Sequence, residues 1–130
     1  LEGHSDADVL IHALMNALLG AMGKGDIGIH FPDTDSRYKG ISSERLLARV
    51  LRMVDQEGLG LMNGDITLIA EKPRLAPFFP EIKKNLSRLL KVPPSRLNIK
   101  AVTTEGLGWV GEGRGIAATA VVLLRRKRRG

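Results

Sequence analysis

The stretch Gly3-His4-Ser5-Asp6-Ala7-Asp8-Val9-Leu10-Ile11-His12 puts two imidazoles and two carboxylates at the start of an apolar run that reaches Met22. In a helix Asp8, His12 and Asn16 lie four residues apart and form one narrow polar stripe. The other side chains of the run are mostly aliphatic, which predicts a helix that is buried nearly all round. The stripe is therefore expected to face something specific, such as a metal, a ligand or the backbone of a partner.

Two interpretations of this cluster remain open from the residues alone. A histidine beside a carboxylate is more often a hydrogen-bonded structural pair than a metal ligand. The grouping of His4, Asp6, Asp8 and His12 within nine residues favours a metal site. Zinc takes three or four protein ligands, however, so a catalytic zinc site here needs at least one donor from elsewhere.

Length and composition indicate a single domain over residues 1–130 with a sizeable core. The chain contains no cysteine, which excludes disulfides, thiolate zinc sites and a cysteine nucleophile and fits a reducing compartment. No apolar run approaches the ~20 residues that span a bilayer, so we expect no membrane partner. The chain enters the His4 cluster almost at once, and we expect that an N-terminal strand segment is missing.

Positive charge is concentrated at the C-terminal end. The formal net charge is +6, and five of the positive charges lie in the basic tail 125–130, which leaves the body of the chain nearly neutral. Such a run binds nucleic acid or an anionic surface in some proteins, and more often it is a solvated end. One Trp, one Tyr and three Phe are too few for a base-stacking platform. We therefore interpret the tail as incidental and expect no nucleic-acid partner.

Periodicity and turn residues predict the order helix, helix, strand, helix, strand, strand. The second helix is expected from Ser42 or Ser43 to about Gly58, and the third from Pro80. The expected strands cover residues 64–70, 97–103 and 115–124. This order predicts an α/β fold, in the form of an α+β two-layer sandwich with a small mixed sheet and helices on one face. Three strands are few for so many apolar helix faces, so either strands are missing upstream or the other face of the sheet packs against another subunit.

Three loops carry residues that suit phosphate or nucleotide binding. Residues 26–40 form a stretch of about 15 residues without periodicity, and loops of that length are usually functional or disordered. Its three Asp, with Arg37 and Lys39, suit a polyanion held through metal and cations, or equally a solvated acidic turn. Residues 71–77 form a proline-restricted loop that either seats a flat ligand or simply connects elements. Thr103-Thr104-Glu105 suits phosphate oxygens and a divalent cation, or is a plain polar strand end.

The stretch Gly106-Leu107-Gly108-Trp109-Val110-Gly111 matches the dinucleotide fingerprint G-x-G-x-x-G in its letters. That fingerprint must open a helix within a βαβ unit. Here further glycines follow through Gly115, and then a β-like run, so no good helix can start. We therefore reject a Rossmann fold.

Four segments together resemble one known family, 2-C-methyl-D-erythritol 2,4-cyclodiphosphate synthase of the non-mevalonate isoprenoid pathway. They keep the family's order and spacing across essentially the whole chain. Each segment is weak alone, and the combination is highly specific. The segments are His4-Ser5-Asp6-Ala7-Asp8 with His12-Ala13-Leu14, Gly25-Asp26-Ile27-Gly28 with Phe31-Pro32-Asp33-Thr34-Asp35, Ala70-Glu71-Lys72-Pro73-Arg74, and Thr103-Thr104-Glu105 with Gly106-Leu107-Gly108-Trp109.

The resemblance implies a lyase that closes a cyclic diphosphate by intramolecular phosphoryl transfer. The 2-phosphate of 4-diphosphocytidyl-2-C-methyl-D-erythritol 2-phosphate attacks the β-phosphorus, and CMP leaves. The family is a homotrimer whose sheets pack around a central axis, with active sites between adjacent subunits. One Zn²⁺ per site, and Mg²⁺ or Mn²⁺ on the diphosphate, are the implied cofactors. We expect a stand-alone enzyme or a fusion with the preceding cytidylyltransferase, in a bacterial cytoplasm or a plastid stroma.

The resemblance also implies roles for residues of this chain. His12 is the implied zinc ligand and Glu105 the implied magnesium ligand, and His4 and Thr103 are the implied catalytic residues that stabilise the transferring phosphate. Residues 26–28 would meet the methylerythritol part, residues 31–35 would close over it, and residues 70–76 would seat cytosine. The implied substrate-binding residues are His4, Ser5, Asp26, Ile27, Gly28, Phe31, Pro32, Asp33, Thr34, Asp35, Ala70, Glu71, Lys72, Pro73, Arg74, Leu75, Ala76, Val102, Thr103, Thr104, Glu105 and Trp109.

The chain departs from the family pattern at three places. The family's N-terminal Asp-x-His pair supplies two further zinc ligands and would precede the first residue, so we expect a fragment rather than a degraded paralogue. Glu112 and Arg114 stand in exchanged positions, and Asn16 stands where an Asp is common. Two alternatives to the cyclase follow: a non-catalytic trimeric cytidine-nucleotide-binding module that has lost zinc, and a nucleic-acid-binding trimer that uses its basic tails.

Overall fold

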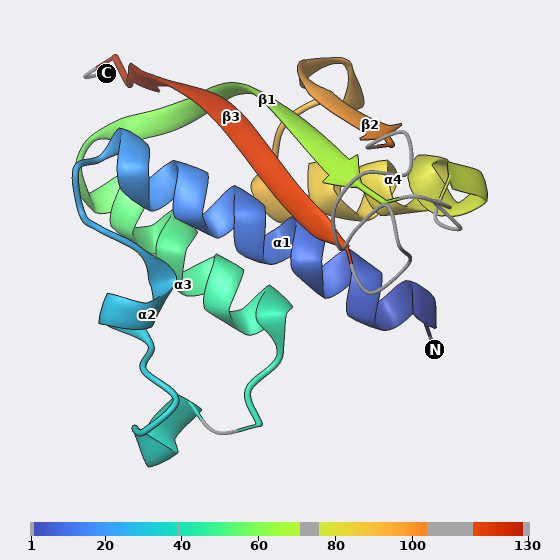
Figure 1. The fold of residues 1–130 in the computed structure, drawn as a ribbon. Coiled ribbons are helices and arrows are strands. Elements are labelled where there is room, and N and C mark those ends of the chain that lie inside the picture. Colours follow the sequence, from blue (N-terminus) through green and yellow to red (C-terminus); the bar gives the residue numbers. More distant parts are fainter. Residues whose placement is uncertain (1, 39, 71–75, 104–115, 129–130) are drawn as a thin grey trace.

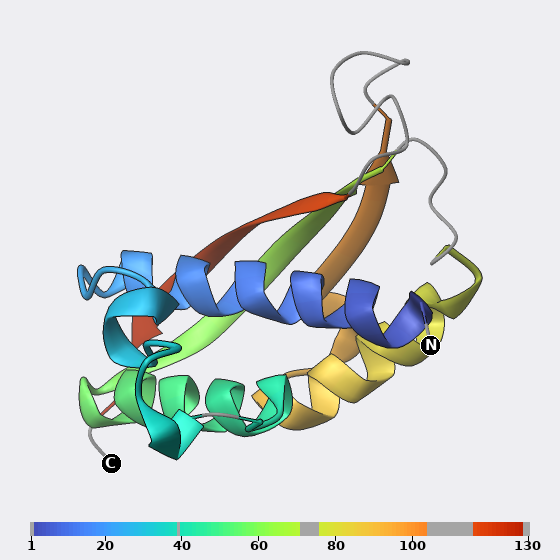
Figure 2. The same ribbon diagram turned by 60° about the horizontal axis from the view of Figure 1, so that its bottom comes forward.

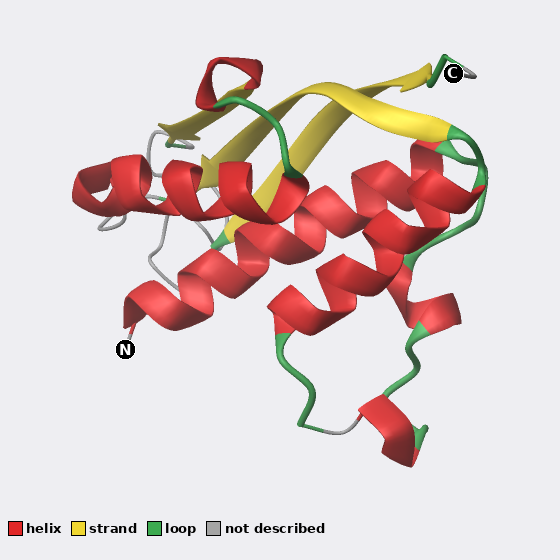
Figure 3. Ribbon diagram, turned by 180° about the vertical axis from the view of Figure 1, so that it is seen from behind, coloured by secondary structure: helices red, strands yellow, loops and turns green. Residues whose placement is uncertain are grey.

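The computed structural model describes residues 2–38, 40–70, 76–103 and 116–128. In these ranges three long helices cover one face of a three-stranded sheet (Figures 1, 2 and 3), which confirms the predicted α+β two-layer arrangement. The elements are α1 (Glu2–Ala21), α2 (Ile27–His30), η1 (Ser36–Tyr38), α3 (Ser43–Gln56), β1 (Leu59–Ile69), η2 (Ala76–Phe78), α4 (Phe79–Leu90), η3 (Pro94–Arg96), β2 (Leu97–Val102) and β3 (Ala117–Arg126), where η marks a 3-10 turn.

The sheet is mixed, as predicted, and its strand order is β2-β1-β3. β1 runs parallel to β2, with Gly64 opposite Leu97. It runs antiparallel to β3, with Ile69 opposite Ala117. Because β1 is central, the strand end that follows Ile69 lies between its neighbours at one edge of the fold (Figure 1).

β1 begins at Leu59 rather than at the predicted residue 64, and a glycine turn explains the difference. Gly58 has a φ of +72°, a left-handed conformation that disfavours any side chain, and its N–H donates to the Asp55 carbonyl at 2.9 Å. The turn ends α3 and leads directly into the strand. No loop residues are needed after Gly58, so residues 59–63, which were expected to connect the helix to the strand, belong to β1.

The C-terminal basic run begins inside the sheet, because β3 extends to Arg126 and not to residue 124 as expected. Arg125 and Arg126 continue β3 and lie opposite Gly60 and Leu59. The backbone N–H of Lys127 donates to the Gly58 carbonyl at 2.9 Å, and its side chain forms an ion pair with Asp55. The run therefore extends the sheet at the end where α3 turns into β1.

Helix α1 forms the centre of the hydrophobic core. It lies between the sheet and α3 (Figure 2), and its fully buried side chains include Leu10, Leu14, Met15, Leu18 and Leu19. Asp8, His12 and Asn16 are exposed along one edge of the same helix, so the predicted polar stripe is confirmed. None of the helices in the described ranges is long and apolar enough to cross a membrane.

Local signals also position the other helices. Ser42 caps α3 by accepting a hydrogen bond from the N–H of Arg45 at 3.3 Å. Pro80 lies in the first turn of α4, and Lys91 ends that helix with a left-handed φ of 56°. The Asn85 side-chain amide donates to Glu44 at 2.9 Å and ties α4 to α3.

The face of the sheet away from the helices carries exposed apolar side chains. Val121 and Leu123 on β3 are 73% and 57% exposed. Beside them Lys100 forms an ion pair with Asp65 at 2.8 Å, and the Asn98 amide donates to the same carboxylate at 3.0 Å. These two hydrogen bonds hold the pKa of Asp65 below its usual value, and the bond from Lys100 has the larger effect. This face is a candidate contact surface for another subunit.

Candidate functional site

The first group of predicted site residues is residues 26–38, called the 26–38 segment below. Its first part, α2, lies near the C-terminal end of α1, and the chain then runs past α3 to η1 (Figures 1 and 2). Asp26 caps α2 by accepting a hydrogen bond from Ile29 N–H at 3.0 Å. The Asn16 side chain on α1 accepts from Ile27 N–H at 2.9 Å, and His30 Nε2 donates to the Lys24 carbonyl at 2.7 Å. The predicted irregular loop was therefore wrong in part, because these caps form one short helix and η1 follows it.

The second half of the segment is held by an ion pair and by aromatic packing. The Arg37 guanidinium donates to both Asp35 oxygens, to Oδ2 at 2.7 Å and to Oδ1 at 3.1 Å, which holds the pKa of Asp35 below its usual value. Phe31 packs against the core and meets the Tyr38 ring edge-on. Asp33 and Thr34 are exposed at the tip. Of the predicted substrate residues here, Asp35 is thus engaged by the chain itself, whereas the tip faces solvent.

His12, the implied zinc ligand, lies one helical turn before Asn16 on the polar stripe of α1 and faces the start of α3. Its ring is exposed, and Nε2 is hydrogen-bonded to Ser43 Oγ at 3.2 Å. Among the described residues no group of three His, Cys, Asp or Glu side chains is close enough to hold a metal ion. A single imidazole does not make a zinc site. In the described part of the chain His12 is therefore one candidate donor, and a zinc site needs two or three more.

A second group of predicted residues follows the strands. Ala70 is 2% exposed, and its N–H donates to the Val102 carbonyl at 3.1 Å, which joins the carboxyl ends of β1 and β2. Val102 and Thr103 are exposed beside it. These three residues, the strand-end group, lie toward the end of the molecule where α1 begins, in Figures 1 and 2 alike. His4 and Ser5 belong to that first turn of α1.

The structure does not bring the two groups together within one chain. His4 and Asn16 are separated by about 18 Å along α1, at 1.5 Å per residue. Ile27 of the 26–38 segment contacts Asn16, in the C-terminal half of α1, whereas the strand-end group lies at the carboxyl ends of β1 and β2. Ala76 is described only as the first residue of η2. The predicted site residues that lie outside the described ranges are Glu71, Lys72, Pro73, Arg74, Leu75, Thr104, Glu105 and Trp109.

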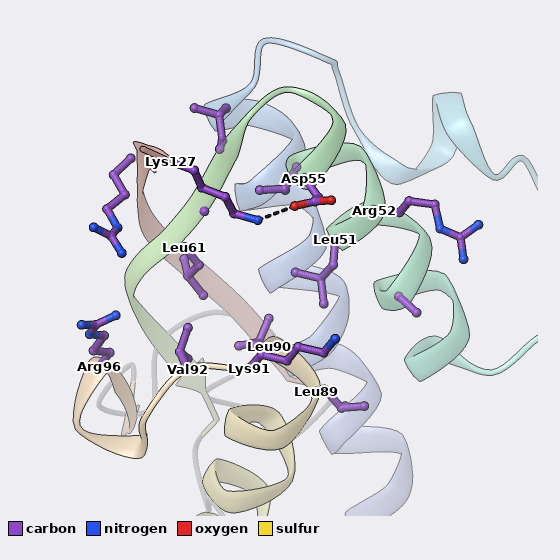
Figure 4. Close-up of a pocket in the computed structure, with 15 residues that line it drawn as sticks. Leu51, Arg52, Asp55, Leu61, Leu89, Leu90, Lys91, Val92, Arg96 and Lys127 are labelled. Carbon is purple, nitrogen blue, oxygen red and sulfur yellow. Dashed lines mark hydrogen bonds and ion pairs between the residues drawn. The ribbon is translucent and has the colours of Figure 1, made fainter. Parts of the chain in front are cut away.

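A groove of about 560 Å³ opens elsewhere, between the C-terminal parts of α3 and α4 and the start of β1 (Figure 4). Leu51, Leu61 and Leu90 are among its apolar lining residues, and the ion pair of Lys127 with Asp55 spans one side. None of the residues that line this groove is a predicted site residue. It therefore plays no part in the candidate site.

Sequence reasoning missed the residues that hold the 26–38 segment in place. Asn16 was predicted to lie on the polar stripe of α1 and was noted as a departure from the family pattern, but its partner was not predicted; its hydrogen bond to Ile27 shows what it does. Tyr38 contacts Phe31 and the guanidinium groups of Arg37 and Arg49. An arginine on the exposed side of a helix carries no signal of such a contact, so only the fold could reveal it.

The fold is that of the cyclodiphosphate synthases. The structure titled "2C-Methyl-D-erythritol-2,4-cyclodiphosphate Synthase (bound form CDP)" matches with a TM-score of 0.80 and 40% identity, over 88% of this chain and 74% of that chain. The chain belongs to the YgbB family, whose model matches residues 1–125.

Two further relatives are consistent with this assignment. The 2-C-methyl-D-erythritol 2,4-cyclodiphosphate synthase of Pelotomaculum thermopropionicum is 56% identical over 126 residues, which is 97% of this chain and 78% of that protein. The structure of the bifunctional IspDF from Campylobacter jejuni matches with a TM-score of 0.84 and 40% identity, over 89% of this chain and 31% of that chain. The fold therefore occurs both alone and within a bifunctional protein.

Proposed function

We propose that this protein converts 4-diphosphocytidyl-2-C-methyl-D-erythritol 2-phosphate into 2-C-methyl-D-erythritol 2,4-cyclodiphosphate and CMP. An oxygen of the 2-phosphate forms a bond to the β-phosphorus, and the bond from that phosphorus to the oxygen bridging it to the α-phosphorus breaks. The bridging oxygen leaves with CMP. The observation that carries the proposal is 56% identity to a named synthase across 97% of the chain. One structural neighbour is a cyclodiphosphate synthase in its CDP-bound form, which fits a cytidine nucleotide.

The reaction needs positioning and charge neutralisation more than a protein nucleophile, because both reacting groups belong to one substrate. The 26–38 segment would bind the methylerythritol part, since its tip residues Asp33 and Thr34 face solvent. The strand-end group would border the cytidine and phosphate side, with His4 and Thr103 next to the transferring phosphate. Divalent cations would neutralise the phosphate charge when bound. Glu105 remains the proposed ligand of magnesium or manganese.

We further propose a homotrimer in which adjacent subunits each supply one of the two groups. Two observations support it: the groups lie at different parts of α1 in one chain, and the sheet face away from the helices exposes Val121 and Leu123. Burying such apolar side chains between copies removes them from water, which favours association. The bifunctional neighbour supports a possible fusion with the preceding cytidylyltransferase. A bacterial cytoplasm or plastid stroma is the proposed location, because the cysteine-free chain fits a reducing compartment.

The direct test measures CMP release from the diphosphocytidyl substrate with zinc and magnesium present, and again after a chelator is added. The proposal expects chelator-sensitive release. Thr103→Val should lower kcat about 100-fold, the typical loss when one hydrogen-bonding group that stabilises transition-state charge is removed. Ser95→Ala, at an exposed position of η3 outside both groups, is the control and should keep wild-type turnover. Absence of CMP release, or equal rates for the two variants, would contradict the assignment.

Zinc binding by His12 is tested separately, by competition against a chromophoric chelator. Losing an outer-shell partner of a metal typically weakens affinity 10–100-fold, so His12→Ala should weaken zinc binding by at least about 100-fold. His30→Ala is the matched control, because His30 bonds the Lys24 carbonyl instead. Equal zinc affinity of wild type and His12→Ala would contradict zinc binding by His12 and leave it a structural residue that is hydrogen-bonded to Ser43.

A further inference from the structure

Tyr38 joins the 26–38 segment to helix α3. Its ring meets the Phe31 ring edge-on, with centroids 5.2 Å apart and planes at 79°. The guanidinium carbon of Arg49, on α3, lies over the Tyr38 ring at 5.5 Å from its centroid, and that of Arg37 at 5.2 Å. Both distances fall in the range of cation–π attraction, and the ring pair has the edge-to-face geometry that aromatic side chains prefer.

These contacts complete a set that holds both ends of the segment. At its start, Asn16 on α1 accepts the Ile27 N–H. At its end Asp35 binds Arg37 through both carboxylate oxygens, so this carboxylate serves the internal structure of the segment. Arg49 is the member of the set that comes from α3. Between the two ends lie the exposed tip residues 33 and 34.

We propose that Arg49 is a positioning residue for the cyclisation, acting through Tyr38 to hold residues 31–35 in the conformation that meets the substrate. The inference rests on the proposed function and deepens it. Arg49 itself need not touch the substrate. A segment that is already ordered loses less conformational freedom when the ligand binds, so the contact strengthens binding by pre-organisation. Because the ordered segment serves ground state and transition state alike, its loss is expected in KM rather than in kcat.

The experiment compares steady-state CMP release by wild type, Arg49→Ala and Arg49→Lys. Arg49→Ala should raise KM about two- to five-fold with kcat unchanged, which is the factor expected from one exposed cation–π contact. Arg49→Lys keeps a cation that can lie over the ring and should restore most of the loss. Arg52→Ala is the matched control, since Arg52 is an exposed arginine on the same helix and belongs to neither group. It should leave both parameters at the wild-type values.

A second readout does not depend on activity. Tyr38 is the one tyrosine in the chain, so selective labelling of tyrosine gives a single set of ring signals in an NMR spectrum. Arg49→Ala should shift these signals, and Arg52→Ala should not. This measurement separates the Tyr38 contact from the catalytic assignment, because it applies whether or not CMP is released.

Three outcomes would overturn the inference. One is unmoved Tyr38 signals in Arg49→Ala. Another is a lower kcat with unchanged KM, which is what a loss of folded protein would give. The third is an equal KM change in Arg52→Ala. Absence of CMP release by wild type would remove the proposed function and this positioning role with it, while shifted Tyr38 signals would still establish the contact itself.

Discussion

The hydrogen bond from Ile27 N–H to the Asn16 side chain gives a sharp prediction about how the candidate site is built. It joins residues 11 apart in sequence, one on α1 and the other at the first position of α2, at 2.9 Å. Asn16→Ala removes the acceptor and leaves this helix N–H without its partner. The position is exposed, so water replaces part of what is lost. We expect the free energy of unfolding to fall by about 0.5–1.5 kcal/mol, the usual net value of one hydrogen bond.

The matched variant is Asn16→Asp. A carboxylate oxygen can accept the same N–H, so this variant should stay within about 0.5 kcal/mol of wild type, the limit for a benign surface substitution. The new carboxylate would lie near the carboxylate of Asp26, and repulsion between the two negative charges opposes any gain in stability from a charged acceptor. Either Asn or Asp suits position 16, because both side chains offer an oxygen that accepts the Ile27 N–H.

The assay is thermal unfolding at one fixed protein concentration, since assembly would make the midpoint depend on concentration. For a chain of this length a loss of 1 kcal/mol corresponds to a lower Tm by about 3–5 °C. Asn16→Ala should also raise the KM for the diphosphocytidyl substrate, because residues 26–28 start from this bond. A Tm of Asn16→Ala within about 1 °C of wild type, or an equal loss in Asn16→Asp, would refute the reasoning.

Three further predictions follow from other parts of the fold. Gly58→Ala should destabilise by about 1–2 kcal/mol because Gly58 has a φ of +72°, whereas Gly20→Ala, in α1 with open space around its Cβ, should stabilise by about 0.5–1 kcal/mol; urea unfolding of both variants checks the sign. Asp65→Asn should lower stability above pH 4, and its difference from wild type should shrink as the pH falls below that range. The reason is that a carboxylate with a lowered pKa contributes stability above its unfolded value of about 3.9 and loses it as pH falls through the folded pKa; equal unfolding midpoints at pH 7 would contradict this. Val121→Asp should shift the protein from trimer toward monomer in sedimentation velocity, while Ala48→Asp, at an exposed apolar position on α3 outside both site groups, should not; an unchanged trimer of Val121→Asp would contradict the proposed packing of the sheets.

Elements with strong local signals were predictable from the sequence. The 3.6-residue period of α1 located both its buried face and its stripe of Asp8, His12 and Asn16. Ser42 and Pro80 marked the starts of α3 and α4 because their effects act within the first turn of a helix. The turn at Gly58 was expected to end α3, but the strand that follows it at once was not. A glycine signals a possible left-handed residue without saying how the chain leaves it.

The candidate site was only partly predictable, because its residues meet through contacts that are distant in sequence. The resemblance identified the residue types, and the family match supports the activity. The structure shows the strand-end group joined by the bond from Ala70 to Val102, apart from the 26–38 segment. The two groups lie apart within a single chain, and their meeting between adjacent subunits is a proposal.

The sequence by itself determined which faces are buried, where helices begin, and which family pattern the chain carries, since these depend on residue spacing and on contacts within one turn. Only the tertiary structure decided that Asn16 and Arg49 hold the ends of the 26–38 segment and that the basic run continues β3. Those features arise when elements far apart in the chain come into contact. An exposed Asn or Arg has the same local pattern whether or not such a partner lies across from it, so its role is set by packing rather than by spacing.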